Sequence, residues 1–589
     1  MRSGLSKRAY RFLAAATVSI LLAAVWFILH GTSAGPDLVT GGQSGPPVHE
    51  TAPPSPTLIV LRKMLSTVGG RANADANASD LAAMTGFYGE RTGSLIWVTE
   101  SGLSDKARAV MAEVHRADDW GLRSNDFTLP QLTAAETSPE AVAEAEIKLT
   151  LTVLKYARYA RGGRIPDPSR ISKLLDHTPP VQPPAQVLTD LAATDAADAY
   201  LRALHPKHPQ FERLRQLLLR LRGSEAKGET GGQWTDAKEG AIAYGARLQS
   251  VVPQLQRANS WEPDINIESA RANLNGQPTV EGENVDAAID RIIINMERWR
   301  WVPADMGKFY VWDNVPEFLT RIMKSGQAVH TDEIIVGQPS WPTPSFSANM
   351  KTIVFRPSWG VPDGIKTKEL APLLRKSSGG GLFGLFGGGY SAQAVLDAYD
   401  LRAYVGSRQI DANSVDWANV DIRRYSFQQP PGPKNVLGDV KFMFPNSHDV
   451  YMHDTPERNL FSKSYRALSH GCMRVHDPRR LAEVLLAEDK GWSAAKVQSM
   501  FVSGGEVALD KHIPVHITYF TARVDDNGKL QMYGDFYGLD SRVGAAILGR
   551  KVRFETPRYE DQPVASRQQD RPAPTSQNLA DLISDLFSP

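Results

Sequence analysis

The chain has very little cysteine: Cys472 is the only one among 589 residues. A lone cysteine cannot close an intramolecular disulfide, which excludes a small disulfide-stapled fold. No group of cysteines and histidines has the spacing of zinc ligands, so we expect no metal. A formal net charge of +1 gives no electrostatic footprint for nucleic acid. No repeat of 20–50 residues is evident, which argues against a solenoid or a propeller.

Long apolar runs are also scarce, and the exception lies at the N-terminus. Residues 12–29 form an uncharged apolar run of 18 residues, at the lower limit for spanning a bilayer. Four basic residues precede it and none closely follows: Arg2, Lys7, Arg8 and Arg11. We therefore predict that residues 1–30 are a membrane anchor with a cytoplasmic N-terminus and an external body. Residues 32–34 could be a weak cleavage site, so a removed signal peptide is the alternative.

The composition, with 42% hydrophobic and 22% charged residues, is that of a folded protein, and the length allows two or more domains. Residues 31–56 are rich in Gly, Pro, Ser and Thr and are predicted to be a flexible tether. Over residues 57–222, apolar residues recur at helical spacing, which predicts a mainly helical domain. Residues 223–284 are weakly patterned and are predicted to be a linker.

Residues 285–555 have a different residue pattern. After one helix at 287–298 come short β-rich runs bounded by Pro, Gly and Asn, at 309–312, 334–337, 352–355 and 516–520. These predict a sandwich-like or barrel-like domain, and so an α+β protein. Glycines flank two phenylalanines at 379–389, which suggests a substrate lid at about 363–395 or a surface loop. We assign no function to the polar tail, 556–589.

Cys472 directly follows the run Ser469-His470-Gly471, and His453 lies 19 residues upstream. A thiolate is a nucleophile, and an imidazole can take the thiol proton and later return it to a leaving amine. On an extended strand His470 could share a face with Cys472, whereas His453 would have to arrive on a neighbouring strand. Spacing alone leaves both histidines open. The pattern predicts acyl transfer through a thioester; the alternative is a buried cysteine acting as a small hydrophobe.

The residues around the thiol fit this chemistry. Gly471 permits close backbone approach, so the amides of Gly471 and Cys472 could stabilise an oxyanion. Ser469 could orient a histidine or be a surface serine. Arg466 and Arg474 flank the site and could pair with a substrate carboxylate or be solvated.

These residues resemble the signature of the L,D-transpeptidase catalytic domain of bacterial cell-wall enzymes. The similarity to the large, membrane-anchored Gram-negative branch covers about residues 285–545. It is carried by residues 299–303, 336–337, 343–344, 355–362, 427–432, 435–438, 441–446 and 453–456. The helical region resembles that branch's scaffold domain at 87–88, 95–97, 121–122 and 159–162. The peptidoglycan-binding module expected at 223–284 has no clear copy, beyond a possible remnant at 245–248.

The resemblance implies a role for each residue of the motif. Cys472 would be the nucleophile and His453 the general base, with His470 supporting the site. The main-chain carbonyl of Asp454 would orient the imidazole. The amides of His470, Gly471 and Cys472 would form the oxyanion hole. We expect four further side chains to bind substrate: Arg474, Arg466, Tyr451 and Trp359.

The predicted activity is then an L,D-transpeptidase that forms 3→3 peptidoglycan cross-links with release of D-alanine, without metal or organic cofactor. The partners would be peptidoglycan tetrapeptide stems as donor and acceptor, the inner membrane and cell-wall synthases, with the catalytic domain in the periplasm. The resemblance also implies inhibition by carbapenems.

Alternatives use the same thioester differently. If water attacked the thioester, the protein would be a carboxypeptidase. If a free D-amino acid attacked it, the protein would be an exchange enzyme, and if a lipoprotein lysine did so, it would be an anchoring enzyme. A non-catalytic wall-binding scaffold, a papain-like endopeptidase and a redox thiol sensor are the other classes considered.

Overall fold

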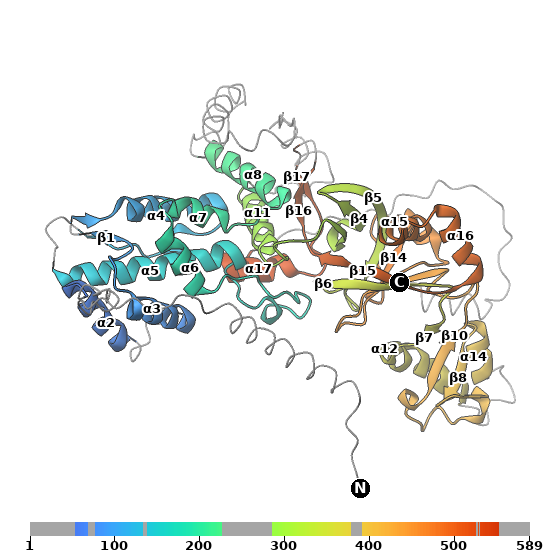
Figure 1. The fold of residues 1–589 in the computed structure, drawn as a ribbon. Helices are drawn as coiled ribbons and strands as arrows, with labels where there is room; N and C mark the ends of the chain where they lie inside the picture. Colours follow the sequence, from blue (N-terminus) through green and yellow to red (C-terminus); the bar gives the residue numbers. More distant parts are fainter. Residues whose placement is uncertain are drawn as a thin grey trace, which may run out of the picture. The chain divides into compact units, whose positions relative to one another are not determined.

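The computed structural model describes residues 54–68, 77–99, 101–132, 138–225, 285–378, 391–525, 528 and 530–552 (Figure 1). By its contacts the chain divides after Pro53, and the second unit, residues 54–589, holds every described residue. The predicted anchor, the Gly/Phe segment and the tail lie outside the described residues, as do almost all of the tether and the linker. Among the helices of the described ranges, none combines the length and apolar character needed to span a bilayer.

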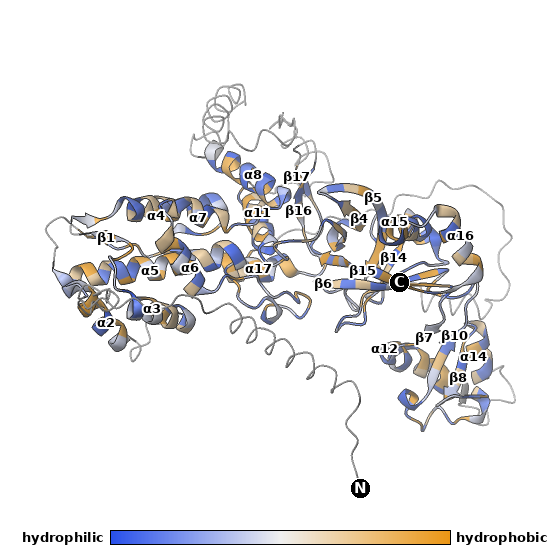
Figure 2. Ribbon diagram, in the orientation of Figure 1, coloured by the Kyte–Doolittle hydropathy of each residue, from blue (hydrophilic) through white to orange (hydrophobic). Residues whose placement is uncertain are grey.

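The first part of the unit is helical and has its own apolar core, in agreement with the predicted fold class. Its helices are α2 (Pro56–Val68), α3 (Ala78–Glu90), α4 (Asp105–His115), α5 (Pro139–Gly162), α6 (Pro184–Ala193) and α7 (Ala197–Ala203). Figure 2 shows hydrophilic and hydrophobic residues mixed along these helices, as expected for elements that bury one face.

Local sequence signals set the ends of the longest of these helices, α5. Ser138 caps its start by accepting a hydrogen bond from the Ala141 amide, and Pro139 occupies the first turn. Gly163 ends it with φ of 86°, a conformation that favours glycine. A side chain at Gly163 would also collide with the Glu297 carboxylate, since an added Cβ would lie 2.5 Å from Oε1.

That carboxylate joins the helical part to the β-rich part that follows it. Glu297 is fully buried, and its Oε1 accepts hydrogen bonds from the backbone amides of Arg164 (2.5 Å) and Ile165 (3.2 Å). It lies on α11 (Val285–Trp299), which contacts α8 (Pro209–Glu225) and α17 (Leu539–Leu548). From Ala288 onward α11 is buried on every side, as expected for a helix enclosed by other elements.

A nine-stranded sheet forms the centre of the β-rich part, in the order β13-β5-β14-β12-β11-β6-β15-β3-β4. Because β4 also pairs with β5, the sheet closes on itself like a barrel. Its strands are β3 (Phe309–Asn314), β4 (Leu319–Lys324), β5 (Gln327–Gly337), β6 (Phe346–Phe355), β11 (Val440–Met443), β12 (Met452–His453), β13 (Ala467–Ser469), β14 (Met473–Val475) and β15 (Gly505–Thr518). The β-rich class predicted for this region is confirmed.

Residues 359–378 and 391–429, inserted between β6 and β11, form a smaller unit that we call the insertion subdomain. Its sheet has the order β7-β10-β8-β9, made of β7 (Trp359–Gly360), β10 (Ser426–Gln429), β8 (Arg402–Val405) and β9 (Arg408–Ile410). Two helices, α13 (Ala371–Ser378) and α14 (Ala392–Ala398), pack with it around a separate apolar cluster that includes Leu374 and Trp417. The predicted lid region therefore belongs to a larger folded unit.

Candidate active site

Strand pairing brings His453 and Cys472 to one face of the sheet. β12 and β14 run parallel, with Met452 opposite Met473 and His453 opposite Arg474. The Met473 amide donates to the Tyr451 carbonyl (3.0 Å), which continues this register by one residue and sets Cys472 beside Tyr451. Side chains alternate along a strand, so the odd-numbered residues of β12 share a face with Cys472.

The hydrogen bond at His453 defines its tautomer. Nδ1 lies 2.5 Å from the carbonyl oxygen of Asp454. A carbonyl can only accept, so Nδ1 carries the proton and Nε2 is left with a free lone pair. Burial, together with the positive charges of Arg474 and Lys441, lowers the pKa of His453 to about 3. The imidazole is therefore neutral at neutral pH and able to accept a proton.

Asp454 is held in place by its own side chain. Its carboxylate accepts hydrogen bonds from the amides of Asp439 (2.8 Å) and Thr455 (2.6 Å) and pairs with Arg458. Gly438 makes room for it: the residue has φ of 57°, and an added Cβ would lie 2.4 Å from the carboxylate. The backbone that presents the Asp454 carbonyl to His453 is thus fixed from several directions.

The turn before Cys472 depends on Gly471 and Ser469. Gly471 has φ of 106°, which other residues rarely adopt. The suggestion that Ser469 orients a histidine is wrong: its hydroxyl donates to the Cys472 carbonyl (2.5 Å) and accepts from the Gly471 amide (3.2 Å). Since that amide is engaged, the amides of His470 and Cys472 are the two left for an oxyanion among the three predicted.

Two hydroxyls that sequence reasoning did not single out support this turn. The buried Thr343 hydroxyl donates to the Gly471 carbonyl (2.7 Å) and accepts from the Gly337 amide (2.8 Å). The Tyr537 hydroxyl accepts from the Thr343 amide (3.0 Å) and donates to the Gly337 carbonyl. Thr343 did fall in a segment that resembles the family, whereas Tyr537 carried no signal in the sequence.

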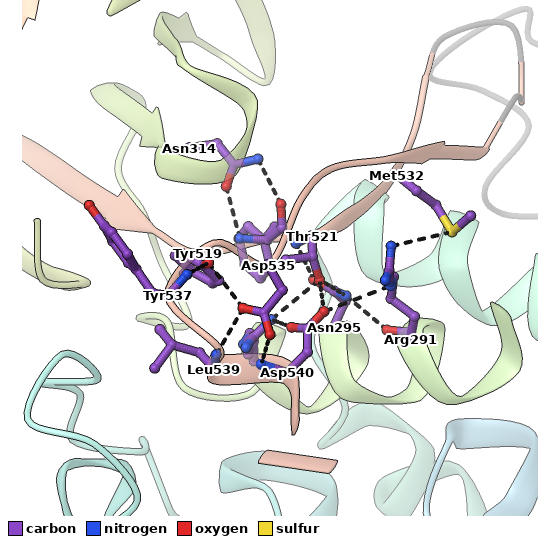
Figure 3. A network of polar contacts seen from close by, with 12 residues as sticks. Arg291, Asn295, Asn314, Tyr519, Thr521, Met532, Asp535, Tyr537, Leu539 and Asp540 are labelled. Carbon is purple, nitrogen blue, oxygen red and sulfur yellow. Dashed lines mark hydrogen bonds and ion pairs between the residues drawn. The ribbon is translucent and has the colours of Figure 1, made fainter. Parts of the chain in front are cut away.

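Tyr537 belongs to a buried polar network shown in Figure 3. Its amide donates to the Tyr519 hydroxyl (2.9 Å), which donates to Asp535 (3.0 Å). Asp535 also accepts from the amide of Asp540 (2.9 Å), whose carboxylate pairs with Arg298 of α11 at 2.5 Å. A continuous series of contacts thus connects the turn before the thiol to the helix at the junction with the helical part.

The second histidine, His470, contacts a carboxylate of the insertion subdomain. His470 Nε2 lies 2.8 Å from Oε1 of Glu369, which belongs to the insertion subdomain, and its ring packs on Trp341 with centroids 5.5 Å apart. This contact ties the turn before Cys472 to the insertion subdomain.

Neither predicted arginine is available to a substrate carboxylate. Arg466 is buried, and its guanidinium donates to three carbonyls, those of Ile334, Lys463 and Phe318. The proposed substrate role of Arg466 is therefore wrong. Arg474 is half-buried and forms an ion pair with Glu457.

Tyr451, also predicted to bind substrate, lies beside Cys472 in the strand register. Burial raises the pKa of Tyr451, and Trp359, the other aromatic residue predicted to bind substrate, acts on the same hydroxyl. Lys441 on β11 places its ammonium 3.8 Å from the centroid of the Tyr451 ring. Tyr451 thus lies beside the nucleophile, with the Lys441 ammonium on its ring.

The thiol is protonated at rest. Burial and the negative charge of Asp449 raise the pKa of Cys472 to about 11, against the lowering effect of Tyr451 hydrogen bonds and of Lys441. The side chain is half-buried, so a substrate can reach it. Among the described residues, no group of three His, Cys, Asp or Glu could hold a metal ion.

Two sequence families match the chain: a scaffold domain over residues 82–218 and the L,D-transpeptidase catalytic domain over residues 308–502. A Haemophilus influenzae protein with the provisional name L,D-transpeptidase is 28% identical over 274 residues, or 46% of this chain. The match spans only 52% of that relative. Tyr519, Asp535, Tyr537 and Asp540 of the network in Figure 3 lie beyond the residues that match the catalytic domain.

Solved structures were also compared. An L,D-transpeptidase from Mycobacterium smegmatis is 11% identical, with 36% of this chain and 58% of that chain covered and a TM-score of 0.16. L,D-transpeptidase 3 from Mycobacterium tuberculosis is 12% identical, with 36% and 61% covered and a TM-score of 0.16.

Proposed function

We propose that this chain, which carries an L,D-transpeptidase catalytic domain and a scaffold domain, cross-links peptidoglycan by acyl transfer through Cys472. One observation carries the proposal. Cys472 lies on the same face as a neutral histidine whose Nδ1 is fixed on the Asp454 carbonyl. A nucleophile with a base that is itself oriented by a third group is the arrangement of covalent acyl transfer.

In the first half of the reaction, Nε2 of His453 takes the proton of the Cys472 thiol. The sulfur attacks the carbonyl carbon of the third stem residue of a donor tetrapeptide. A C–S bond forms and the C–N bond to D-alanine breaks. His453 returns the proton to the D-alanine nitrogen, and a thioester remains on the enzyme.

In the second half, the neutral side-chain amine of another stem attacks the thioester. A C–N bond forms, the C–S bond breaks, and His453 takes the proton that the amine loses. His453 then gives this proton to the released sulfur, which restores the thiol and the neutral imidazole. The product is a 3→3 cross-link, and no metal or organic cofactor takes part.

The amides of His470 and Cys472 would hold the oxyanion that forms in each half. Tyr451 presents aromatic surface beside Cys472, and with Trp359 it would position the donor stem. Arg474, bound to Glu457, would act on His453 through its charge rather than on the substrate.

We place this reaction at the external face of the inner membrane. The proposal rests on the apolar run at 12–29 and the basic residues before it. Peptidoglycan stems would be the substrates, and cell-wall synthases the proposed protein partners.

Intact-mass analysis tests the function. The full-length chain is mixed with a disaccharide-tetrapeptide, beside Cys472→Ala, His453→Ala and the control His512→Ala, which changes an exposed histidine of β15. We expect a dimer formed with loss of one D-alanine by wild type and H512A, and none by C472A. H453A should be slower by a factor of about 100 or more, the range of general base catalysis.

Other outcomes separate the alternatives. Loss of D-alanine without a dimer would indicate a carboxypeptidase. An unchanged substrate, with Cys472 still open to alkylation, would reject catalysis on this substrate and favour a non-catalytic scaffold.

A further inference from the structure

A lysine to which the sequence pattern assigned no role lies on the same face as the nucleophile. Lys441 pairs across β11 and β12 with His453, so its side chain shares the face that carries Cys472. The half-buried ammonium rests on the Tyr451 ring, 3.8 Å from its centroid. This cation–π contact holds the ammonium in place without neutralising its positive charge.

The other charged groups that face the sulfur cannot do the same. His453 is neutral, because burial lowers its pKa to about 3. Arg474 is bound to Glu457, and Asp449 is negative and opposes a thiolate. The contact described for Lys441 is with the Tyr451 ring, its charge interacts with Cys472 through space, and no carboxylate is among its described partners.

We propose that the ammonium of Lys441 is the counter-charge of the Cys472 thiolate, a positioning residue that acts on the sulfur through space. An opposite charge at close range favours an ionised group by about one to three pK units. The thiolate fraction at neutral pH should therefore depend on Lys441 by a factor of about 10 to 100.

The same cation has a second effect, on the base. Lys441 faces His453 directly and opposes its protonation, as Arg474 does. Loss of the Lys441 charge should therefore make the thiol harder to ionise and the imidazole easier to protonate. If Lys441 served packing alone, its replacement would change neither the pKa of Cys472 nor the pKa of His453. Opposite effects on the two groups would therefore identify an electrostatic role.

The lone cysteine makes this measurable in the whole protein, since alkylation by iodoacetamide reports on Cys472 alone. Alkylation rates from pH 6 to 10.5 are compared for the full-length wild type, Lys441→Met, Lys441→Arg and the control Lys511→Met, an exposed lysine of β15. We expect K441M to react at least about tenfold more slowly at pH 7.5, with its profile displaced to higher pH. K441R and K511M should stay within about threefold of wild type.

Three results would overturn the proposal. K441M could react like wild type with the same pH profile. K441R could be as slow as K441M, which would assign Lys441 to proton transfer, because an arginine cannot be deprotonated. K511M could react as slowly as K441M, which would show that the rate depends on the net charge of the protein and not on the position of Lys441. If K441M loses its near-ultraviolet circular dichroism, Lys441→Gln provides the same comparison with a polar side chain.

The His453 titration is read separately. The imidazole proton resonances of wild type and K441R should titrate at lower pH than those of K441M, with assignment by His453→Gln. These experiments need no peptidoglycan, so their outcome stands whether or not the proposed cross-linking is observed.

Discussion

Replacing Thr343 by valine should loosen the turn that carries the nucleophile. Valine has nearly the same shape as threonine but lacks the hydroxyl that donates to the Gly471 carbonyl (2.7 Å) and accepts from the Gly337 amide (2.8 Å). Thr343 is only 1% exposed, so water cannot replace either bond. A buried polar group left unpaired costs about 1–3 kcal/mol, and two such groups give about 2–6 kcal/mol.

This loss should reach the chemistry because the Gly471 carbonyl is one residue from Cys472. A shift of about 1 Å in a reacting group can cost about a hundredfold in rate. We therefore expect T343V to form dimers at about one hundredth of the wild-type rate. Thr343→Ser is the matched control, since it keeps the hydroxyl and loses one methyl group, worth about 1 kcal/mol.

Hydrogen exchange suits the measurement better than global unfolding, because a chain of several domains need not unfold in one step. Peptides that contain Gly337 and Gly471 should exchange faster in T343V and remain close to wild type in T343S. Equal exchange and equal dimer formation in the two variants would refute the reasoning.

Three further predictions concern the site. Since burial raises the pKa of Cys472 to about 11, its alkylation rate should climb about tenfold per pH unit from pH 7 to 10; a plateau by pH 9 would contradict this. Glu369→Ala should free His470 and speed hydrogen exchange in the insertion subdomain, and unchanged exchange would show that the contact is not a restraint. Gly438→Ala should lower dimer formation at least tenfold, because the added methyl group would push on the Asp454 carboxylate. Gly432→Ala is the control and should behave as wild type, since its added methyl group meets no atom within 4 Å. Equal activity of the two variants would show that Gly438 is not needed to position Asp454.

The pH dependence of stability has a definite sign at His453. Its pKa is about 3 in the folded chain, while an unfolded histidine titrates near 6.5. The unfolded state therefore binds the extra proton first, and stability should fall by up to about 1.4 kcal/mol per pH unit between pH 6.5 and 3. His453→Gln should show a shallower fall in urea denaturation of the β-rich part, and an identical slope would reject the shift.

Much of the secondary structure could be predicted from the chain itself. Helical spacing predicted the helical part as a whole and located α11, and β-rich runs located parts of β3, β5, β6 and β15. Closure of the sheet through the β4–β5 pair was not readable, because pairing between distant strands leaves no local pattern. The sequence predicted only a lid or a surface loop where the insertion subdomain lies, for the same reason. This subdomain is held together by an apolar core that segments distant in the chain share.

The sequence by itself determined which groups are available: one thiol, two nearby histidines, a glycine before the thiol and cations around it. Only the tertiary structure decided what each one does. Parallel pairing of β12 with β14 brought His453 to the thiol, and Glu369 engaged His470. The pairing of β11 with β12 set Lys441 opposite His453, with its ammonium on the Tyr451 ring. The reason is physical: a side chain's charge state and hydrogen bonds depend on its neighbours, and here those neighbours come from strands far apart in the chain.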